Sequence, residues 1–465
     1  MALAAVQPDM TVEDVQELLE RTEKGQVKNT VRNAETILSY DPFLRGCIRY
    51  NEMSQQMDLV KDMGWNRKGD GSSITDDDMY NIHLYFSRIY GFNSLALIDE
   101  AAHIVSRRTS YHPIRELLTS LEWDGKERIR NAMKHFLGAE ASDYSYGILR
   151  QFMLGAACRV FSPGVKFDLM LCVVGDQGAG KSSFFRLLAL RDEWFTDDLK
   201  DLSKDDVYEK LQGHWIIEMS EMLAQRTAKN DEATKAFLSR NRDSYRTRYN
   251  KYAKDRPRQC VFAGTTNRLH FLPNDRTGNR RFMPISCTET EAEVFILDNE
   301  KESREYIRQM WAELMEIMRT SDYSLKLPKE LEKEVVRRQS MYMQEDADAG
   351  SILGYLEQYT GDKVCSKQLY KEALGHEYDQ PTRRDLVEIN EIMTQLIRNG
   401  TLKGWRRFDT PRRFGRPYGT QKGWERIPVD PETPSTEGEF TRVEPEDRNP
   451  FEQLSLPILQ ENRSG

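Results

Sequence analysis

Apolar positions follow a helical spacing in the first part of the chain. In residues 11–24 the apolar side chains fall on one face, which predicts a short amphipathic helix. Thr11 followed by Asp14 is typical of a helix N-cap, and Gly25 is a stop signal. Further helices are predicted at 77–90, 97–106 and 113–121. We therefore expect residues 1–110 to form a helical N-terminal region.

From Phe167 the spacing changes to short, continuous apolar runs. These runs predict strands at 168–174, 214–219, 260–264 and 281–285, with helical or loop segments between them. Strands that alternate with helices indicate an α/β fold with a parallel sheet. We expect one such domain over residues 111–325, which includes the helices before the first strand and ends with a helix at 300–320.

The helical spacing returns in the last third of the chain. A charged connecting helix is predicted within 326–346, and a separate module within 347–427. That module contains a long amphipathic helix, ended by Asn399 and Gly400, followed by a segment with the spacing of a β-hairpin. This order predicts a winged-helix-like domain. Residues 428–465 are acidic and rich in proline, which predicts a disordered tail.

Composition adds limits to this outline. The chain has 465 residues, which is too long for one ordinary core, and its apolar runs are far shorter than a membrane span. The N-terminus does not resemble a signal peptide, so we expect a cytoplasmic protein without a membrane contact. The net charge is −8, but residues 239–258 hold eight Lys/Arg against two Asp, and residues 398–426 hold nine against two acids. Such local excesses point to contacts with nucleic acid.

A glycine-rich loop follows the first predicted strand. Its sequence, GDQGAGKS, fits G-x-x-x-x-G-K-[ST], and a helical stretch comes directly after it. In this motif the glycines let backbone amides surround phosphates, the lysine reaches the β- and γ-phosphates, and the serine hydroxyl binds Mg²⁺. We therefore predict that ATP and Mg²⁺ are bound there. The predicted nucleotide-binding residues are Gly175, Asp176, Gln177, Gly178, Ala179, Gly180, Lys181, Ser182 and Ser183.

Polar residues at the ends of later strands are candidates for the chemistry of hydrolysis. Glu218 ends the strand HWIIE and is the candidate carboxylate on the Mg²⁺ side, together with Ser182. Glu221 is the candidate for polarising the attacking water. Because both acids are Glu and lie three residues apart, the sequence leaves open which of them has which role. Asn267 follows the next strand and suits a sensor of the γ-phosphate.

Two adjacent arginines precede the last predicted strand of the α/β domain. Arg280 or Arg281 could reach the nucleotide of a neighbouring subunit as an arginine finger. They could equally bind DNA or pair with acids. The sequence leaves these roles open.

The motifs together resemble the virulence-associated E (VapE-like) family of phages and mobile elements. The similar segments are GDQGAGKS, HWIIEMSE, CVFAGTTN, DRTGNRRF, DSYRTRY and YHPIRELLTSLEWDG, and they extend over roughly residues 100–290. That family is related to superfamily III (AAA+-type) helicases. The resemblance implies a P-loop AAA+-like core, assembly as a ring, usually a hexamer, and movement along DNA. The acid pair departs from the usual pattern of that superfamily.

The resemblance also implies a DNA-gripping β-hairpin within residues 239–258. Cations interleaved with tyrosines suit such a role, because cations contact phosphates and rings stack on bases. The candidate DNA-binding residues are Arg246, Arg248, Lys251 and Tyr252. A basic loop or a subunit contact remains the alternative. A second candidate is the C-terminal hairpin, whose aromatic residues could instead form its core: Trp405, Phe408, Phe414, Tyr418 and Trp424.

The sequence thus predicts an ATP-dependent DNA helicase or replication-initiator ATPase of a phage or mobile element. Its expected partners are single-stranded DNA in a ring channel, further copies of the chain, and phage replication proteins. The alternative is a nucleotide-gated regulatory or interaction protein of virulence, defence or mobile-element control, without robust unwinding. A small-molecule kinase would share only the glycine-rich loop.

Overall fold

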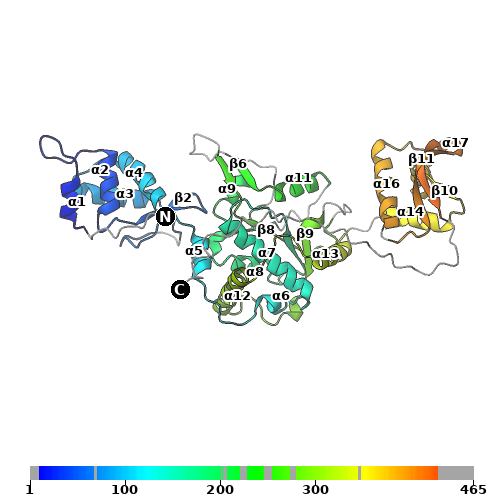
Figure 1. The fold of residues 1–465 in the computed structure, drawn as a ribbon, viewed down its shortest axis with the longest axis horizontal. Coiled ribbons are helices and arrows are strands. Elements are labelled where there is room, and N and C mark those ends of the chain that lie inside the picture. Colours follow the sequence, from blue (N-terminus) through cyan, green and yellow to red (C-terminus); the bar gives the residue numbers. More distant parts are fainter. Residues whose placement is uncertain are drawn as a thin grey trace. The chain divides into compact units, whose positions relative to one another are not determined.

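The described chain falls into two compact units, one ending at Met343 and the other beginning at Ala347. Figure 1 presents the computed structural model, with the units coloured along the sequence. No helix within the described residues combines the length and the apolar character needed to span a bilayer. The structure describes residues 10–67, 71–199, 202, 207–219, 228–245, 254–272, 279–343, 347–398 and 400–427.

The N-terminal part of the first unit contains four helices and a small hairpin. Its elements are α1 (Val12–Leu18), α2 (Val31–Tyr40), β1 (Ile48–Asn51), β2 (Gln56–Leu59), α3 (Asp76–Tyr90) and α4 (Leu95–Arg108). The antiparallel β1–β2 pair is an addition to the helical region that the sequence predicts. Apolar side chains of all four helices and both strands share one core.

The start of α1 is as predicted, and its end is not. The side chains and backbone of Thr11 and Asp14 form a reciprocal capping box. The helix stops at Leu18, since Leu19 is already extended, and Gly25 lies in a turn between the paired residues Arg21 and Val27. Gly25 has φ of 77°, which is the left-handed conformation that suits such a turn.

A five-stranded parallel sheet forms the centre of the first unit. Its order is β4 (Phe195–Thr196), β5 (Ile216–Glu218), β8 (Val261–Thr266), β3 (Met170–Val174), β9 (Phe282–Ser286). The predicted mixed α/β fold with a parallel sheet is therefore confirmed. Four strands lie where the sequence predicts them, and β4, which follows the short 3-10 helix η1 (Asp192–Trp194), is an addition.

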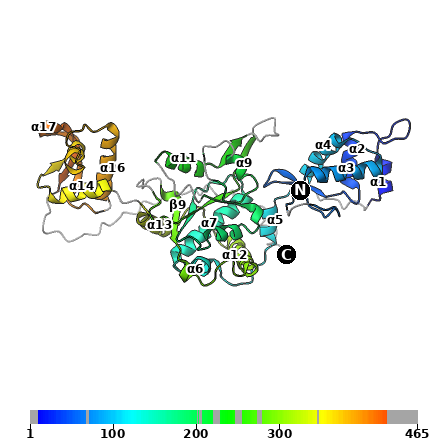
Figure 2. The ribbon, with the colours of Figure 1, turned by 180° about the vertical axis from the view of Figure 1, so that it is seen from behind.

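Helices cover both faces of this sheet, as Figures 1 and 2 show from opposite sides. One face packs against a core shared with α5 (Pro113–Ser120), α6 (Ile129–Leu137), α7 (Asp143–Phe161), α8 (Lys181–Leu188) and α12 (Glu300–Thr320). The other packs against α9 (Val207–Leu211) and α11 (Ala228–Leu238). Consecutive residues serve the two faces, since Ile216 joins the first core and Ile217 the second. Burial on both faces explains the continuous apolar runs of these strands.

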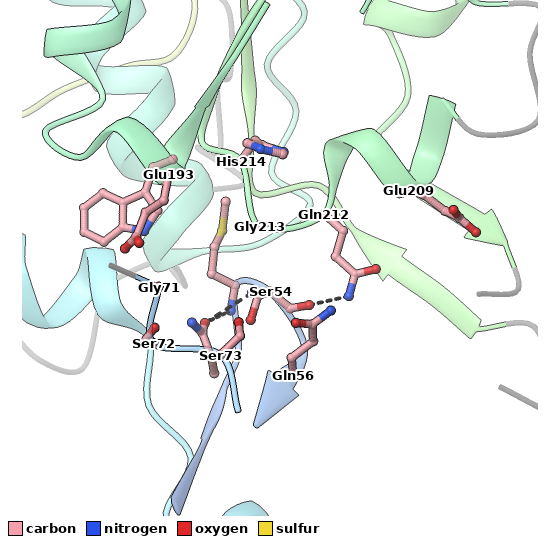
Figure 3. Close-up of a pocket in the computed structure, with 13 residues that line it drawn as sticks. Ser54, Gln56, Gly71, Ser72, Ser73, Glu193, Glu209, Gln212, Gly213 and His214 are labelled. Atoms are coloured by element: carbon pink, nitrogen blue, oxygen red, sulfur yellow. Dashed lines mark hydrogen bonds between the residues drawn. The ribbon is translucent and has the colours of Figure 1, made fainter. Parts of the chain in front are cut away.

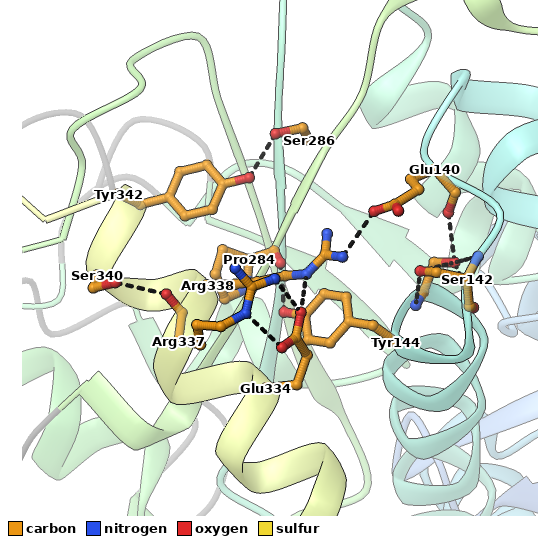
Figure 4. A network of polar contacts seen from close by, with 11 residues as sticks. Glu140, Ser142, Tyr144, Pro284, Ser286, Glu334, Arg337, Arg338, Ser340 and Tyr342 are labelled. Carbon is orange, nitrogen blue, oxygen red and sulfur yellow. Dashed lines mark hydrogen bonds and ion pairs between the residues drawn. The ribbon is translucent and has the colours of Figure 1, made fainter.

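Helix α13 (Lys329–Met341) forms hydrogen bonds with strand β9 and the turn before it. The Gln339 amide donates to the backbone carbonyls of Asn279 and Phe282 at 2.7 and 2.6 Å. Just after the helix, the Tyr342 and Ser286 hydroxyl oxygens lie 2.6 Å apart, and Figure 4 shows this contact within a wider polar network. The strand beside β3 is thus held along its length.

The second unit combines helices with a three-stranded antiparallel sheet. Its elements are α14 (Ala347–Gln358), β10 (Lys363–Val364), α15 (Ser366–Gln368), the π-helical turn η4 (Leu369–Ala373), α16 (Arg383–Arg398), β11 (Trp405–Phe414), α17 (Gly415–Tyr418) and β12 (Gly419–Arg426). The predicted long helix and hairpin are confirmed. Trp405, Phe408, Phe414 and Trp424 are buried, which favours the alternative that these aromatic residues form the core of the hairpin.

Candidate nucleotide and metal site

The glycine-rich loop connects β3 to α8 at the carboxyl edge of the sheet. Gly178 and Gly180 have φ of 95° and 75°, a region that side-chain-bearing residues adopt only with strain. A Cβ added to Gly175 would lie 2.4 Å from the Cys287 sulfur, so this position also requires glycine. The loop therefore presents backbone close to whatever occupies it, as a phosphate-binding loop must.

Lys181 begins α8 and turns back over the loop. Its ammonium group donates to the carbonyls of Gly175 and Asp176 at 2.7 and 2.5 Å, and to Oδ1 of Asn267 at 2.9 Å. Burial lowers the pKa of Lys181, since only 8% of the residue is exposed. Lys181 and the sensor candidate at the end of β8 are thus brought together from positions 86 residues apart.

Glu218 is fully buried at the end of β5, beside the start of α8. The Ser182 hydroxyl donates to Glu218 Oε1 at 2.8 Å, and the Thr265 hydroxyl donates to the same oxygen. The other oxygen, Oε2, is buried and has no hydrogen-bond partner within the described chain. Burial raises the pKa of Glu218, because a carboxylate without a full set of partners is costly in the interior.

This arrangement fits the predicted Mg²⁺ site. A buried carboxylate with one unsatisfied oxygen, next to a serine hydroxyl, is a donor set that a hard divalent cation prefers. A bound cation would also stabilise the charge that burial disfavours. Thr265 was not among the predicted residues, and its hydroxyl gives Glu218 Oε1 a second hydrogen bond. Glu221 lies outside the described residues.

Arg280 and Arg281 stand at the other edge of the sheet. They form the 3-10 turn η2 (Asn279–Arg281) before β9, which runs parallel to β3, so they lie at the amino ends of the strands. Arg281 donates to the Ser239 hydroxyl at 2.9 Å and lies 3.4 Å from the Asp168 carboxylate. Arg280 is exposed. A five-residue strand separates both from the loop, or about 16 Å, so neither contacts the loop of its own chain.

A hairpin is present where the family resemblance implies one. Strands β6 (Arg242–Tyr245) and β7 (Lys254–Pro257) pair antiparallel. Its base is fixed by a buried ion pair in which Arg258 donates twice to Asp243, at 2.6 and 2.8 Å. The segment that joins the strands, with all the candidate DNA-binding residues, lies outside the described residues: Arg246, Arg248, Lys251 and Tyr252.

A cavity of about 440 Å³ lies elsewhere in the first unit, between the β1–β2 turn and the loop before β5 (Figure 3). The Gln212 amide donates to the Ser54 carbonyl across it. Glu193, Glu209 and His214 also line this cavity. None of the predicted nucleotide-binding or catalytic residues does, so the cavity is separate from the glycine-rich loop.

Comparison with known proteins identifies the class of the central domain. Residues 118–344 match the model of the virulence-associated protein E-like domain. The match confirms the resemblance predicted from the motifs, and it starts later and extends further than the 100–290 expected. This part of the chain is therefore a VapE-like domain.

The solved structures similar to the chain are more distant. Two apo A-form structures of the NrS-1 C terminal region have TM-scores of 0.44 at 13% and 12% sequence identity. Each alignment covers 82% of this chain and 96% of the other. Comparison with curated proteins gives no match.

Proposed function

We propose that the protein is a Mg²⁺-dependent ATPase of the helicase or replication-initiator type, encoded by a phage or mobile element. One observation supports this most strongly. Lys181 and Ser182 from the start of α8, Glu218 from β5 and Asn267 after β8 come from three separate segments and converge beside one glycine-rich loop. Each has the chemistry that ATP hydrolysis requires at its position.

The loop and its neighbours have separable tasks in this proposal. The Lys181 ammonium exchanges its carbonyl and Asn267 contacts for β- and γ-phosphate oxygens, which neutralises the charge that develops on the leaving group. The amide of Asn267 is then free to orient the γ-phosphate or the water. Ser182 and the unsatisfied oxygen of Glu218 would hold Mg²⁺, which supplies Lewis-acid stabilisation of the phosphates.

An AAA+-like core is supported by the strand order. β8 lies between β3 and β5, so its carboxyl end brings Asn267 between the loop and Glu218. The winged-helix-like assignment of the second unit is supported by its long amphipathic helix followed by the β11–β12 hairpin.

Assembly into a ring, with a hexamer as the expected form, is supported by the position of the arginine pair. Exposed Arg280 is too far from its own loop to act there, so a role at the nucleotide requires the loop of a neighbouring subunit. DNA binding in the channel is supported by the hairpin β6–β7 and by the excess of eight cations over two acids in residues 239–258. Phage replication proteins are the further expected partners.

The test is the ATPase rate with and without single-stranded DNA. We expect DNA-stimulated hydrolysis that Lys181→Ala abolishes while the fold remains intact. Replacing Arg246, Arg248 and Lys251 by Ala should flatten the slope of log K against log salt by about two units, since each phosphate contact contributes about 0.7. Tyr252→Ala should weaken binding without changing that slope. Weak hydrolysis without any DNA effect would favour a nucleotide-gated regulatory protein instead.

A further inference from the structure

Strand β4 brings an unassigned acid to the carboxyl edge of the sheet. β4 has two residues and pairs parallel with β5, with Phe195 opposite Ile216 and Thr196 opposite Ile217. Asp197 follows Thr196 directly after the last paired residue of β4, and Glu218 follows Ile217 on β5. Neighbouring strands lie about 4.8 Å apart, so the two acids start from adjacent backbone positions.

Alternation of side chains along β4 and β5 predicts that both acids lie on the same face of the sheet. Phe195 packs against the core that contains Ile216, the one shared with α8. Side chains alternate along a strand, so the residues two positions further on, Asp197 and Glu218, return to this face. It is the face on which Ser182, in the first turn of α8, contacts Glu218.

The two carboxylates differ in environment. Glu218 is fully buried, with one oxygen accepting two hydroxyl hydrogen bonds and the other without a partner in the described chain. Asp197 is exposed at the end of its strand.

Among the described residues, the site lacks an assigned carboxylate that polarises water, since Glu221 lies outside them. Glu218 is committed to Ser182 and Thr265 and is suited to a cation, whereas hydrolysis also needs a group that takes a proton from water. The next residue along β5, Met219, is apolar and fully buried. Asp197, an exposed acid beside Glu218 on the same face, has the chemistry of a group that takes a proton from water.

We propose that Asp197 is the carboxylate that polarises the attacking water. This inference rests on the proposed ATPase function. The water oxygen forms the new bond to the γ-phosphorus, and the bond from that phosphorus to the β–γ bridging oxygen breaks. The electron pair of the broken bond leaves with ADP, and the water proton passes to the Asp197 carboxylate.

The experiment compares Asp197→Asn with Asp198→Asn in the full chain. Asp198 is the matched control, because it is the adjacent exposed acid and its carboxylate pairs with Lys210 at 2.7 Å. Steady-state ATPase, binding of a fluorescent ATP analogue with Mg²⁺, and melting temperature are measured for both. We expect Asp197→Asn to lower kcat about 100-fold or more, with nucleotide affinity changed less than about threefold and the melting temperature unchanged. Asp198→Asn should keep kcat.

Three results would overturn the assignment. They are a kcat for Asp197→Asn within about threefold of the wild type, an equal loss in both variants, or a loss of nucleotide binding that accounts for the lost activity. A normal Asp197→Asn variant alongside an inactive Glu221→Gln would give the role to Glu221. A wild-type protein that binds ATP and never hydrolyses it would overturn the proposed function as well.

Discussion

Replacing Glu218 by Gln should separate the stability of the protein from its activity. Gln keeps Oε1 as the acceptor for the Ser182 and Thr265 hydroxyls and removes the buried charge. Two hydrogen bonds lose their charged partner, at about 1 kcal/mol each, and the new amide N–H group, placed where Oε2 has no partner, costs about 1–3 kcal/mol. Removing the buried, incompletely compensated charge of Glu218 stabilises the folded state by several kcal/mol, which offsets these losses. We therefore expect the free energy of unfolding without nucleotide to change by less than about 2 kcal/mol.

Glu218→Ala is the contrasting variant. It leaves both hydroxyls without an acceptor in a buried position, at about 1–3 kcal/mol each, and adds a cavity. Denaturant unfolding should therefore find the Ala variant less stable than the Gln variant by at least about 2 kcal/mol. Equal stabilities would refute the hydrogen-bond arrangement at Glu218.

Activity should fall in both variants alike. Loss of the carboxylate on the metal side removes about 3 kcal/mol of transition-state stabilisation, which corresponds to about 100-fold in kcat. Mg²⁺-ATP should raise the melting temperature of the wild type more than that of Glu218→Gln. A Gln variant with full kcat would show that Glu218 does not hold the cation.

Three further predictions concern other parts of the first unit. Arg280→Ala should lose ATPase without losing stability, and activity should return in part on mixing with a Lys181→Ala protein; no rescue in a protein that stays monomeric would refute a shared site. Asp243→Ala should lower the free energy of unfolding by about 3–5 kcal/mol in denaturant titrations, because it leaves the Arg258 charge buried and unpaired; a change under 1 kcal/mol would contradict this. Burial lowers the pKa of His112 from 6.5 to about 4, so the unfolded chain binds this proton more readily. Stability from this group is complete above pH 6.5 and should fall by about 3 kcal/mol as the pH drops to 4, and His112→Gln should remove that slope.

The glycine-rich loop was predictable because its determinants are local. Gly178 and Gly180 adopt conformations that their own residue type makes possible, and Lys181 follows directly. The positions of Glu218 and Asn267 were predictable for a related reason, since buried strands are apolar runs and polar residues mark their ends.

Contacts that depend on the register between neighbouring strands could not be predicted from the sequence. Thr265 follows the apolar run that predicts β8, and its hydroxyl reaches Glu218 because β5 and β8 are neighbours. Asp197 follows a two-residue strand, which is too short to leave a period in the sequence. The β1–β2 hairpin was missed because its strands, IRYN and QMDL, have four residues each, and an alternation this short predicts little on its own.

The fastening of β9 by α13 bears on how copies of the protein can associate. β9 is an edge strand, and edges with free backbone groups recruit strands from other chains. Here the Gln339 side-chain amide already donates hydrogen bonds to the backbone carbonyl of Phe282, in the strand, and to that of Asn279, just before it. The strand at the opposite edge, β4, has only two residues that could pair with a strand of another chain. If copies associate as the proposed ring requires, they should therefore meet through helices and loops rather than by extending the sheet. The same arrangement protects the protein from edge-to-edge aggregation.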